Sequence, residues 1–505
     1  MTDLPPGWEW LPLREVGDWY GGGTPSKVKS EYWNNGAIPW LSPKDMGPEV
    51  LVDTKDQITN EAIEGSAVRL VPANSVAMVV RSGILERVFP VALVPFETTL
   101  NQDMRAVVPV AGIEPRWVAW GLRFLQSYVL RHCRKAGTTV ASIEVPRLME
   151  ASLPVPPLAE QQRIIAALES HLSRLDAGLE LTEKVKRRSL QLRSMVFDRA
   201  AQGLLICDEN ELDAVSAVAG LVGRSSKRVS YEGLPPLPVG WQWRVAEEVC
   251  SSIECGSTPR SDLMHEGCGD VPFIKVYNLT RSGSLDFSIR PTFIDRKTHE
   301  IQLKRSKIYP GDVLTNIVGP PLGKTAIVPS DYPEWNMNQA VVVFRSGHEL
   351  LSDWLALALR SKFVMGRLEA TARATAGQFN VALSACRELP IPVPPIDGQK
   401  RILNHARELL SVVDAAELAV ASTESRAMSL RRALLEEAFS GRLVQQDRAD
   451  EPASKLLARI SAKRAAQPKL ERARRTKPKE SPAASRTEWP DASRTPTTYA
   501  QGELL

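Results

Sequence analysis

The stretch GPPLGKT at 319–325 is the part of the chain that most resembles a phosphate-binding loop. Such a loop needs four residues between its first glycine and the Gly-Lys pair, so that successive backbone N–H groups can surround the phosphates. Here three residues intervene, and two of them, Pro320 and Pro321, have no N–H group. The sequence therefore argues against nucleotide binding, but it leaves Lys324 on this loop as a side chain that can contact a phosphate.

Potential metal ligands also occur in the second half of the chain: Cys250, Cys255, His265 and Cys268. Their spacing does not match a zinc finger or a zinc ribbon, and the corresponding part of the first half has neither cysteine nor histidine. The sequence contains no HExxH motif, no GxSxG motif and no Pro-Pro-aromatic motif of an amino-methyltransferase. We therefore predict no metal site, no catalytic residue and no cofactor bound by this chain.

What the sequence does repeat is structural. The openings LPPGWEW (4–10) and LPVGWQW (237–243) are followed by GGGTPSK (21–27) and ECGSTPR (254–260), and later by PVPPLAEQQRI (154–164) and PVPPIDGQKRI (392–402). From these proline-rich stretches onward the offset is constant, because Gln161 and Gln399 are 238 positions apart and so are Gly203 and Gly441. A constant offset over a long segment indicates an internal duplication.

A long helix is expected after each proline-rich stretch. Ile165, Leu168, Leu172, Leu175 and Leu179 recur every three or four residues, which is typical of a coiled-coil seam, and the second copy repeats the pattern. Proline suits the first turn of a helix, and glycine suits the position after its last turn. In the blocks that precede the helices, short runs of β-branched residues predict strands.

The predicted fold is of the α+β class. It has two tandem α/β domains, each followed by a long helix, and the two helices pair as an antiparallel coiled coil under pseudo-two-fold symmetry. The expected boundaries are a first domain at 1–155, a first long helix at 156–205, a linker at 206–233, a second domain at 234–392, a second long helix at 393–444, and a basic, partly disordered tail at 445–505 with a short helix at 452–466.

Composition sets limits on partners and location. The net charge is +4, with 63 basic and 59 acidic residues; residues 446–505 hold 13 basic and 8 acidic residues, so the remainder holds 50 and 51 and has a net charge of −1. A DNA-binding surface on the domains must therefore come from local clusters of basic residues. No apolar run is long enough to span a membrane, no secretory signal begins the chain, and six cysteines are few enough to indicate a reducing compartment. We expect a cytoplasmic protein.

Two matching domains on a rigid helical spacer suit a ligand that carries two separated recognition sites, and duplex DNA is the natural candidate. Basic side chains on matched loops would anchor phosphates, and amide side chains would read base edges. The candidates for phosphate contacts are Lys27, Lys29, Lys44, Arg81, Arg87, Arg260, Lys275, Arg305 and Lys324, and the candidates for base contacts are Asn278, Gln378 and Asn380.

The duplicated openings and the PVPPLAEQQRI and PVPPIDGQKRI stretches resemble the specificity subunit of type I restriction–modification enzymes over about 4–445. Asp397-Gly398 replaces the Ala-Glu of the first copy, which weakens the match there. The resemblance implies a non-catalytic DNA-recognition subunit of an adenine methyltransferase/endonuclease, in which each domain is a target recognition domain for one half of a bipartite duplex DNA sequence. The helices would set the gap between the halves.

The resemblance also implies two methyltransferase subunits as partners, with restriction/translocase subunits as further partners. S-adenosylmethionine, ATP and magnesium would belong to those partners. Docking would use Gln161, Arg163, Gln399 and Arg401 near the starts of the helices. Three alternatives stay open: a modification-only subunit without a nuclease, a coiled-coil scaffold that binds only protein, and an enzyme with its own catalytic centre.

Overall fold

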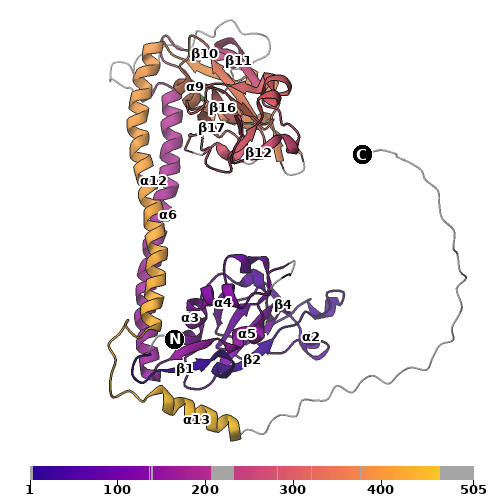
Figure 1. The fold of residues 1–505 in the computed structure, drawn as a ribbon, viewed down its shortest axis with the longest axis vertical. Helices are drawn as coiled ribbons and strands as arrows, with labels where there is room; N and C mark the ends of the chain where they lie inside the picture. The colour runs from indigo at the N-terminus through magenta and orange to yellow at the C-terminus, as the bar shows by residue number, and fades with distance from the viewer. Residues whose placement is uncertain are drawn as a thin grey trace, which may run out of the picture. The chain divides into compact units, whose positions relative to one another are not determined.

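The computed structural model describes residues 4–135, 137, 140–205, 233–280, 282–319, 321–375 and 378–466. Most of the linker predicted at 206–233, and the tail beyond 466, lie outside the described residues. The chain forms two compact units, one of Met1–Gln161 with Asp447–Leu505 and the other of Gln162–Gln446 (Figure 1).

The first unit contains a four-stranded antiparallel sheet in the order β2-β8-β5-β6 and a small sheet in the order β4-β3-β7. A two-stranded ribbon, β1-β9, joins the start of the domain to its end. The strands are β1 (Glu9–Pro12), β2 (Gly17–Gly21), β3 (Ile38–Leu41), β4 (Asp56–Ile58), β5 (Ser75–Val79), β6 (Val91–Val94), β7 (Thr99–Leu100), β8 (Met104–Pro109) and β9 (Ser152–Val155), and the helices are α1 (Leu13–Val16), α2 (Asn60–Glu64), α3 (Pro115–Phe124), α4 (Gln126–His132), α5 (Val145–Glu150) and α13 (Ala453–Ala466).

The second unit repeats this plan. Its four-stranded sheet has the order β11-β19-β16-β17, its ribbon is β10-β22, and a five-stranded sheet has the order β12-β14-β13-β18-β15. The strands are β10 (Gln242–Val245), β11 (Cys250–Cys255), β12 (Met264–Glu266), β13 (Val271–Ile274), β14 (Thr292–Ile294), β15 (Lys307–Ile308), β16 (Val313–Asn316), β17 (Thr325–Ile327), β18 (Trp335–Met337), β19 (Val341–Ser346), β20 (Arg373–Thr375), β21 (Gln378–Asn380) and β22 (Pro390–Val393), and the helices of the domain are α8 (Ala246–Val249), α9 (Ser352–Leu359), α10 (Lys362–Thr371) and α11 (Leu383–Arg387).

The duplication reaches individual hydrogen bonds. In the first domain the Trp117 Nε1 atom donates to the Pro154 carbonyl over 3.0 Å, and in the second the Trp354 Nε1 atom donates to the Pro392 carbonyl over 2.8 Å. Both tryptophan side chains are almost completely buried. Each therefore ties the helix that covers the main sheet to the last strand of the domain, and the predicted two-domain α/β repeat is confirmed.

Each domain leads into one uninterrupted helix of 44 residues, α6 (Leu158–Ala201) and α12 (Ile396–Phe439). At 1.5 Å per residue each helix is about 66 Å long. The Pro-Pro pairs lie just before the first helical residue, where a missing N–H group breaks no intrahelical hydrogen bond. Gly203 and Gly441 follow the last turns with φ of +76° and +73°, the left-handed conformation that ends a helix.

In the second unit α6 and α12 lie side by side and run in opposite directions (Figure 1). Asp176 pairs with Arg431, Lys186 pairs with Glu424 at 3.3 Å, and Arg193 pairs with Glu417 at 3.1 Å. As the residue number on α6 rises, the number of its partner on α12 falls, which defines the antiparallel orientation predicted from the sequence.

The contact between the two helices combines buried apolar residues with a few polar ones. On α6 the apolar seam residues Leu168 and Leu172 are buried near the start and Val196 near the end, whereas the seam positions between them include Ser189 and Arg193. On α12 the buried residues Ala406, Val413, Val420 and Ala427 recur every seven positions. Polar residues inside a seam favour one register over others, because a shifted register leaves them without partners. The ion pairs therefore specify how the helices align.

Two matched glutamines hold the start of each long helix to its own domain. Gln161 Oε1 accepts from the Glu114 N–H over 3.0 Å, and Gln161 Nε2 donates to the carbonyls of Pro156 (3.0 Å) and Gly112 (3.4 Å). Its side chain is completely buried.

Gln399 makes the same three contacts in the second domain. Its Oε1 atom accepts from the Leu351 N–H over 2.9 Å, and its Nε2 atom donates to the carbonyls of Glu349 (2.7 Å) and Pro394 (3.0 Å). Because the amides of Gln161 and Gln399 are buried and bonded inside the domains, neither can touch a partner subunit directly in this structure. Their expected role in docking is replaced by a role in positioning the helices.

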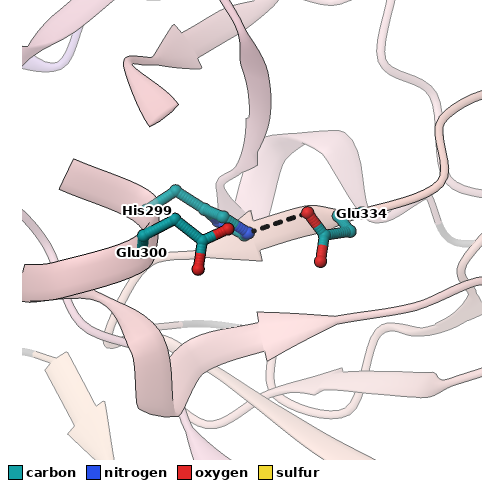
Figure 2. A group of neighbouring side chains, drawn as sticks. All are labelled: His299, Glu300 and Glu334. Carbon is teal, nitrogen blue, oxygen red and sulfur yellow. Dashed lines mark ion pairs between the residues drawn. The ribbon is translucent and has the colours of Figure 1, made fainter. Parts of the chain in front are cut away.

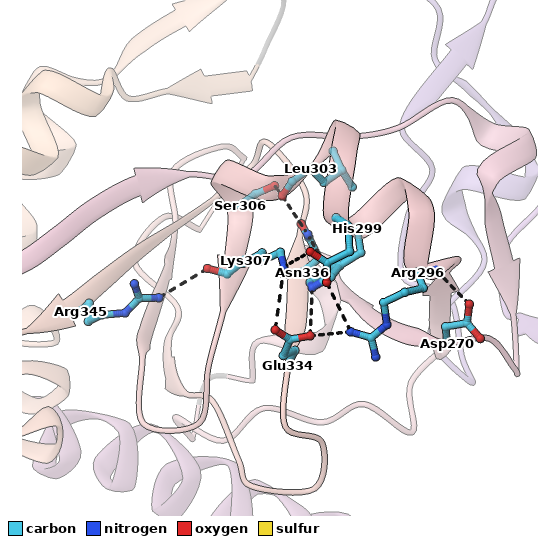
Figure 3. Close-up of polar contacts among 10 residues, drawn as sticks. Asp270, Arg296, His299, Leu303, Ser306, Lys307, Glu334, Asn336 and Arg345 are labelled. Carbon is cyan, nitrogen blue, oxygen red and sulfur yellow. Dashed lines mark hydrogen bonds and ion pairs between the residues drawn. The ribbon is translucent and has the colours of Figure 1, made fainter.

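Beside the five-stranded sheet of the second domain, the short helical segment Thr298–Gln302 carries a buried histidine within a network of charges (Figures 2 and 3). The side chain of His299 is completely buried, and its Nε2 atom lies 3.5 Å from a carboxylate oxygen of Glu334. Arg296 lies 2.5 Å from Glu334, and Lys307 lies 2.5 Å from Glu300. The two carboxylates are thus already neutralised by two cations of the same domain.

The protonation state of His299 follows from its neighbour Asn336. The Asn336 Nδ2 atom donates to the Leu303 carbonyl over 3.2 Å and to His299 Nδ1 over 3.0 Å, while Asn336 Oδ1 accepts from the Met337 N–H. His299 Nδ1 is therefore an acceptor, and the proton lies on Nε2. Burial, together with the nearby Lys307, lowers the pKa of His299 below its ordinary value of 6.5.

Replacing either buried glutamine by leucine will destabilise its domain. Gln161→Leu leaves the Glu114 N–H and the Gly112 and Pro156 carbonyls without this partner, so we expect a loss of about 1–3 kcal/mol in the free energy of unfolding. Denaturant unfolding of the full chain measures it, and Gln162→Leu at the adjacent exposed position is the matched control. Equal stability of the two variants would contradict the positioning role.

The second prediction concerns pH. The unfolded chain protonates this histidine near pH 6.5, whereas native His299 stays neutral to a lower pH. The stabilisation that neutral His299 contributes to the free energy of unfolding is therefore fully present above pH 6.5. It is lost as the pH falls towards the lower pKa of the folded state. The free energy of unfolding should decrease in this window by at most about 1.4 kcal/mol per pH unit from this group. His299→Gln should flatten that slope, and His265→Gln at an exposed position should not. Parallel pH profiles for all three proteins would refute the assignment.

Candidate nucleic-acid interface

In each domain an inner strand of the main sheet ends in a loop that meets a later chain segment. In the first domain the Ser82 N–H donates to the Ala141 carbonyl (3.0 Å) and the Ile143 N–H to the Val80 carbonyl (2.8 Å). In the second the Val381 N–H donates to the Ile317 carbonyl (3.0 Å), beside a backbone bridge between Val318 and Asn380. We call these composite regions the loop–hairpin surfaces; they consist of the described residues among 80–90 with 133–143 and among 317–324 with 373–381.

The first loop–hairpin surface is rich in exposed cations. Arg81 and Arg87 lie on its loop, and Arg134 and Lys135 lie on its later segment. Among the described residues, no acidic side chain forms an ion pair with any of these four. Their charges are therefore available to an anionic ligand, and a chain of phosphates is the polymer that such spaced cations suit.

The sequence prediction missed Arg134 and Lys135. The signal that could have found them is the basic run RHCRK at 131–135, which ends two positions before Gly137. A cluster of basic residues beside a glycine lets a backbone and several cations approach one ligand together. The run is adjacent to Arg81 only through the bridge between Arg81 and Ser142, and that long-range pairing could not be read from one sequence.

The second loop–hairpin surface brings together three of the predicted residues. Lys324 lies on the loop, where its N–H group donates to Asn316 Oδ1 over 2.7 Å, and Gln378 and Asn380 belong to β21 of the hairpin β20-β21. The completely buried Asn316 also donates to the carbonyls of Val318 (3.1 Å) and Pro321 (2.9 Å), so one side chain sets the loop conformation. Asn380 is exposed. These contacts identify the loop GPPLGKT as a braced turn.

The other six predicted cations are exposed or half-exposed but have local partners or lie elsewhere. Lys29 donates to the Tyr32 hydroxyl over 2.9 Å, and Lys44 pairs with Asp56 at 2.6 Å, which raises the pKa of Lys44. Arg260 pairs with the neighbouring Asp262 at 2.9 Å. Lys27, Lys275 and Arg305 belong to other loops of the two domains. Lys44 and Arg260 are partly neutralised by their acidic partners. They therefore attract a phosphate less strongly than the cations of the first loop–hairpin surface do.

Asn278 does not fit its predicted role. Its side chain is 1% exposed, its Oδ1 atom accepts from the Lys275 N–H over 2.9 Å, and its Nδ2 atom donates to the carbonyls of Asp286 (3.1 Å) and Ile289 (2.9 Å). The donor and acceptor atoms of this buried amide are already hydrogen-bonded to backbone groups of its own loop, so none is left to bind a base. The prediction that Asn278 reads DNA is therefore wrong in this conformation, and the residue braces its loop instead.

The residues that could hold a metal do not form a suitable site. Cys250 and Cys255 are in β11 of the main sheet, whereas His265 is in β12 of the five-stranded sheet. Burial raises the pKa of Cys250 to about 12, so it stays a protonated thiol and a poor ligand. In the group of His299, Glu300 and Glu334 (Figure 2), Arg296 and Lys307 already pair with the two carboxylates, and the His299 Nε2 atom carries the proton. No described helix is long and apolar enough to cross a membrane.

Comparisons with known proteins agree with this architecture. A family model described as the type I restriction modification DNA specificity domain matches residues 5–187 and, in a second copy, residues 238–415. The EcoR124I/EcoR124II specificity subunit of Escherichia coli is 49% identical over 161 residues, which are 32% of this chain and 40% of that subunit. The EcoBI specificity subunit of Escherichia coli is 25% identical over 350 residues, which are 66% of this chain and 68% of that subunit.

A solved structure that concerns the assembly and conformational transition of the type I R-M system has the same fold. It superposes with a TM-score of 0.63 at 20% identity and covers 88% of this chain and 100% of that one. Because the family model matches most of the chain, in two copies that coincide with the two repeats of the fold, this protein belongs to the family of type I restriction–modification specificity subunits.

Proposed function

We propose that this protein selects the DNA target of a type I restriction–modification complex by binding a bipartite duplex sequence, one half-site per domain. The single observation that carries the proposal is the pair of corresponding loop–hairpin surfaces, one in each repeat of the fold. A duplicated recognition domain calls for a ligand that presents two recognition sites, and duplex DNA does so along one axis.

The two loop–hairpin surfaces supply different parts of DNA recognition. In the first, Arg81, Arg134 and Lys135 offer exposed charge without local ion pairs among the described residues, which suits contacts to the phosphate backbone. Arginine can also bind guanine through two hydrogen bonds in the major groove. In the second, the exposed Asn380 can pair with adenine, and Lys324 can contact a phosphate.

The paired helices α6 and α12 would set the distance between the half-sites. A length of about 66 Å corresponds to roughly two turns of duplex DNA, at about 34–36 Å per turn. The ion pairs in the seam support this role, because a spacer keeps a fixed length only while its two helices keep one register. Gln161 and Gln399 support it further, since each binds the first turn of its helix to backbone groups of the adjacent domain.

The chemistry of methylation and cleavage would come from partner subunits. In this proposal two methyltransferase subunits bind the helical part of the chain and supply S-adenosylmethionine chemistry, and restriction/translocase subunits supply ATP- and Mg²⁺-dependent steps. Arg401 is exposed at the start of α12 and is the better of the two remaining docking candidates, because Arg163 is half-buried. This chain itself would act without catalysis.

Removing the unpaired charges of the first domain should weaken DNA binding. We expect Arg81→Gln, Arg134→Gln and Lys135→Gln together to lower affinity for the cognate duplex and to reduce the slope of log K against log salt by about 3, close to one per lost phosphate contact. Fluorescence anisotropy of the complex with its methyltransferase subunits, over a salt series, measures both. Lys400→Gln, on α12, is the control.

An unchanged slope in the triple variant would remove the first loop–hairpin surface from the interface. DNA binding with no salt dependence at all, or no binding by the assembled complex to any duplex, would favour a scaffold that contacts only protein. Methyl transfer by the isolated chain would overturn the non-catalytic assignment.

Lengthening both helices should change the gap and leave the half-sites intact. An insertion of seven residues in α6 and seven in α12 preserves the alternation of three and four in the seam and adds about 10 Å, or roughly three base pairs. Sequencing of methylated bases in cells that express the variant with its partners reads both half-sites and the gap. Altered half-site bases with an unaltered gap would contradict the spacer role.

A further inference from the structure

Each domain has the same pair of turns at one end of two neighbouring strands of its main sheet. In the first domain residues 22–24 follow β2, and residues 101–103 precede its antiparallel neighbour β8. In the second domain residues 256–258 follow β11, and residues 338–340 precede β19. We call these two regions the paired-turn clusters. Glycine, threonine, asparagine and glutamine occupy matching positions in both, so the duplication extends to polar residues of the surface.

Glycine is required where the two turns of each cluster touch. A Cβ atom on Gly22 would overlap the carbonyl oxygen of Asn101, and a Cβ atom on Gly256 would overlap the carbonyl oxygen of Asn338. Only a residue without a side chain allows the two backbones to approach so closely. The position of the asparagine–glutamine turn relative to the glycine turn is therefore set in the same way in both domains.

In the first cluster a chain of hydrogen bonds orients the side-chain amide of Gln102. The Asp103 N–H donates to Asn101 Oδ1 over 2.7 Å, which leaves Asn101 Nδ2 to donate to Thr24 Oγ1 over 3.5 Å. The Thr24 hydroxyl in turn donates to Gln102 Oε1. Thr24 and Gln102 are both exposed. Because no described residue accepts a hydrogen bond from Gln102 Nε2, its two N–H groups are available to a ligand at the surface.

The second cluster has the same residues but a less complete chain of hydrogen bonds. The Gln339 N–H donates to Thr258 Oγ1 over 3.4 Å, and Asn338 Oδ1 is buried without a partner among the described residues. Val342 has the position in the strand register that Arg105 has in the first domain. The second glutamine is therefore less firmly oriented, and its cluster lacks the neighbouring cation.

Arg105 gives the first cluster a positive charge. Its Nη1 atom donates to the Gln102 carbonyl over 3.4 Å, so the guanidinium lies against the turn. Within the part of the chain that the structure describes, Arg105 forms no ion pair with an acidic side chain. Its charge offsets that of Asp103 in the same turn. The donors of the first cluster are thus not set in a negatively charged surface.

Each paired-turn cluster adjoins the loop–hairpin surface of its own domain. The Val80 and Arg81 N–H groups donate to the Asp103 carbonyl over 2.8 and 3.3 Å, and the Ile317 N–H donates to the Ala340 carbonyl over 2.9 Å. Each of these carbonyls belongs to the residue that follows the cluster glutamine. A ligand on either loop–hairpin surface therefore lies close to that glutamine.

We propose that each paired-turn cluster binds one phosphodiester of the DNA backbone, with the Nε2 group of Gln102 or Gln339 as the donor. A phosphodiester accepts hydrogen bonds and has none to donate, so it matches an amide whose oxygen is already engaged. Side chains that read different bases must differ between the domains, as Arg81 and Val318 do at matched bridges. The threonine–glutamine pair is identical in both, which suits the part of DNA that all sequences share.

This inference rests on the proposed function, and glutamate variants separate a phosphate contact from a structural role. Gln102→Glu keeps an oxygen for the Thr24 hydroxyl but replaces the donor by a negative charge. In the complex with methyltransferase subunits, we expect Gln102→Ala to weaken binding of the cognate duplex about tenfold, and Gln102→Glu to weaken it further. Gln339→Ala should cost less, about threefold, because its amide is less firmly oriented. The same changes at the exposed Gln57 are the controls.

Independence from sequence is the second measurement. A duplex with both half-sites scrambled should lose affinity by the same factor as the cognate duplex. The slope of log K against log salt should stay unchanged in Gln102→Ala, since a neutral amide displaces no counterion. Methylphosphonate at successive backbone positions locates the contact, because the position that costs the wild-type complex affinity should cost the Gln102→Ala complex nothing further. Denaturant unfolding should show equal stability of the variants and the wild type, since Gln102 is exposed.

Wild-type affinity in Gln102→Glu would overturn the proposal and leave the cluster as a structural turn. A loss confined to the cognate duplex would also overturn it, because Gln102 would then read a base. If the wild-type complex binds no duplex at all, the proposed function fails and this inference fails with it. Normal binding by the wild type together with unaffected variants refutes the paired-turn site alone.

Discussion

The spacer formed by α6 and α12 has a fixed length only if the two helices keep one register. Arg193 is 8% exposed as a side chain and contacts both Asp414 and Glu417. A buried guanidinium that lost these carboxylates would be costly, because a desolvated charge without a partner is strongly destabilising. A seam of leucines alone would stabilise several registers almost equally. The charged residues of the seam therefore contribute more to the alignment of the helices than to their association.

The start of each long helix is held to its own domain by buried amides and tryptophans. Gln161 and Gln399 tie the first turn of each helix to a turn of the adjacent domain, and Trp117 and Trp354 tie the covering helix to the strand that precedes the long helix. All of these contacts run between a side chain and the backbone, so they are indifferent to the identity of the loops that differ between the two domains. The loops of the two domains can differ in sequence while the junctions remain the same.

The elements that the sequence predicted well were those encoded by local periodicity and by duplication. The long helices, the seam pattern and the repeat of the domain plan follow from apolar spacing and from the constant offset between Gln161 and Gln399. The predictions that were wrong or incomplete concern polar side chains whose partners are distant in the sequence or which are buried despite being polar. Asn278 and the two glutamines are polar residues of the kind that often bind ligands at a surface. Their side-chain amides are instead buried and hydrogen-bonded to backbone groups of their own domains. Arg134 and Lys135 approach the loop of Arg81 only through a non-local backbone bridge.

The position of α13 has a consequence for biosynthesis. The first domain leaves the ribosome early, but the helix that covers its Gly7 and Gly112 turns is encoded after residues 162–452. At about 5–20 residues per second, this interval lasts roughly 15–60 s. During that time the nascent chain carries an uncovered apolar surface, on which chaperones or a neighbouring nascent chain can act. Emergence of α13 from the ribosome is then the event that covers this surface of the first domain.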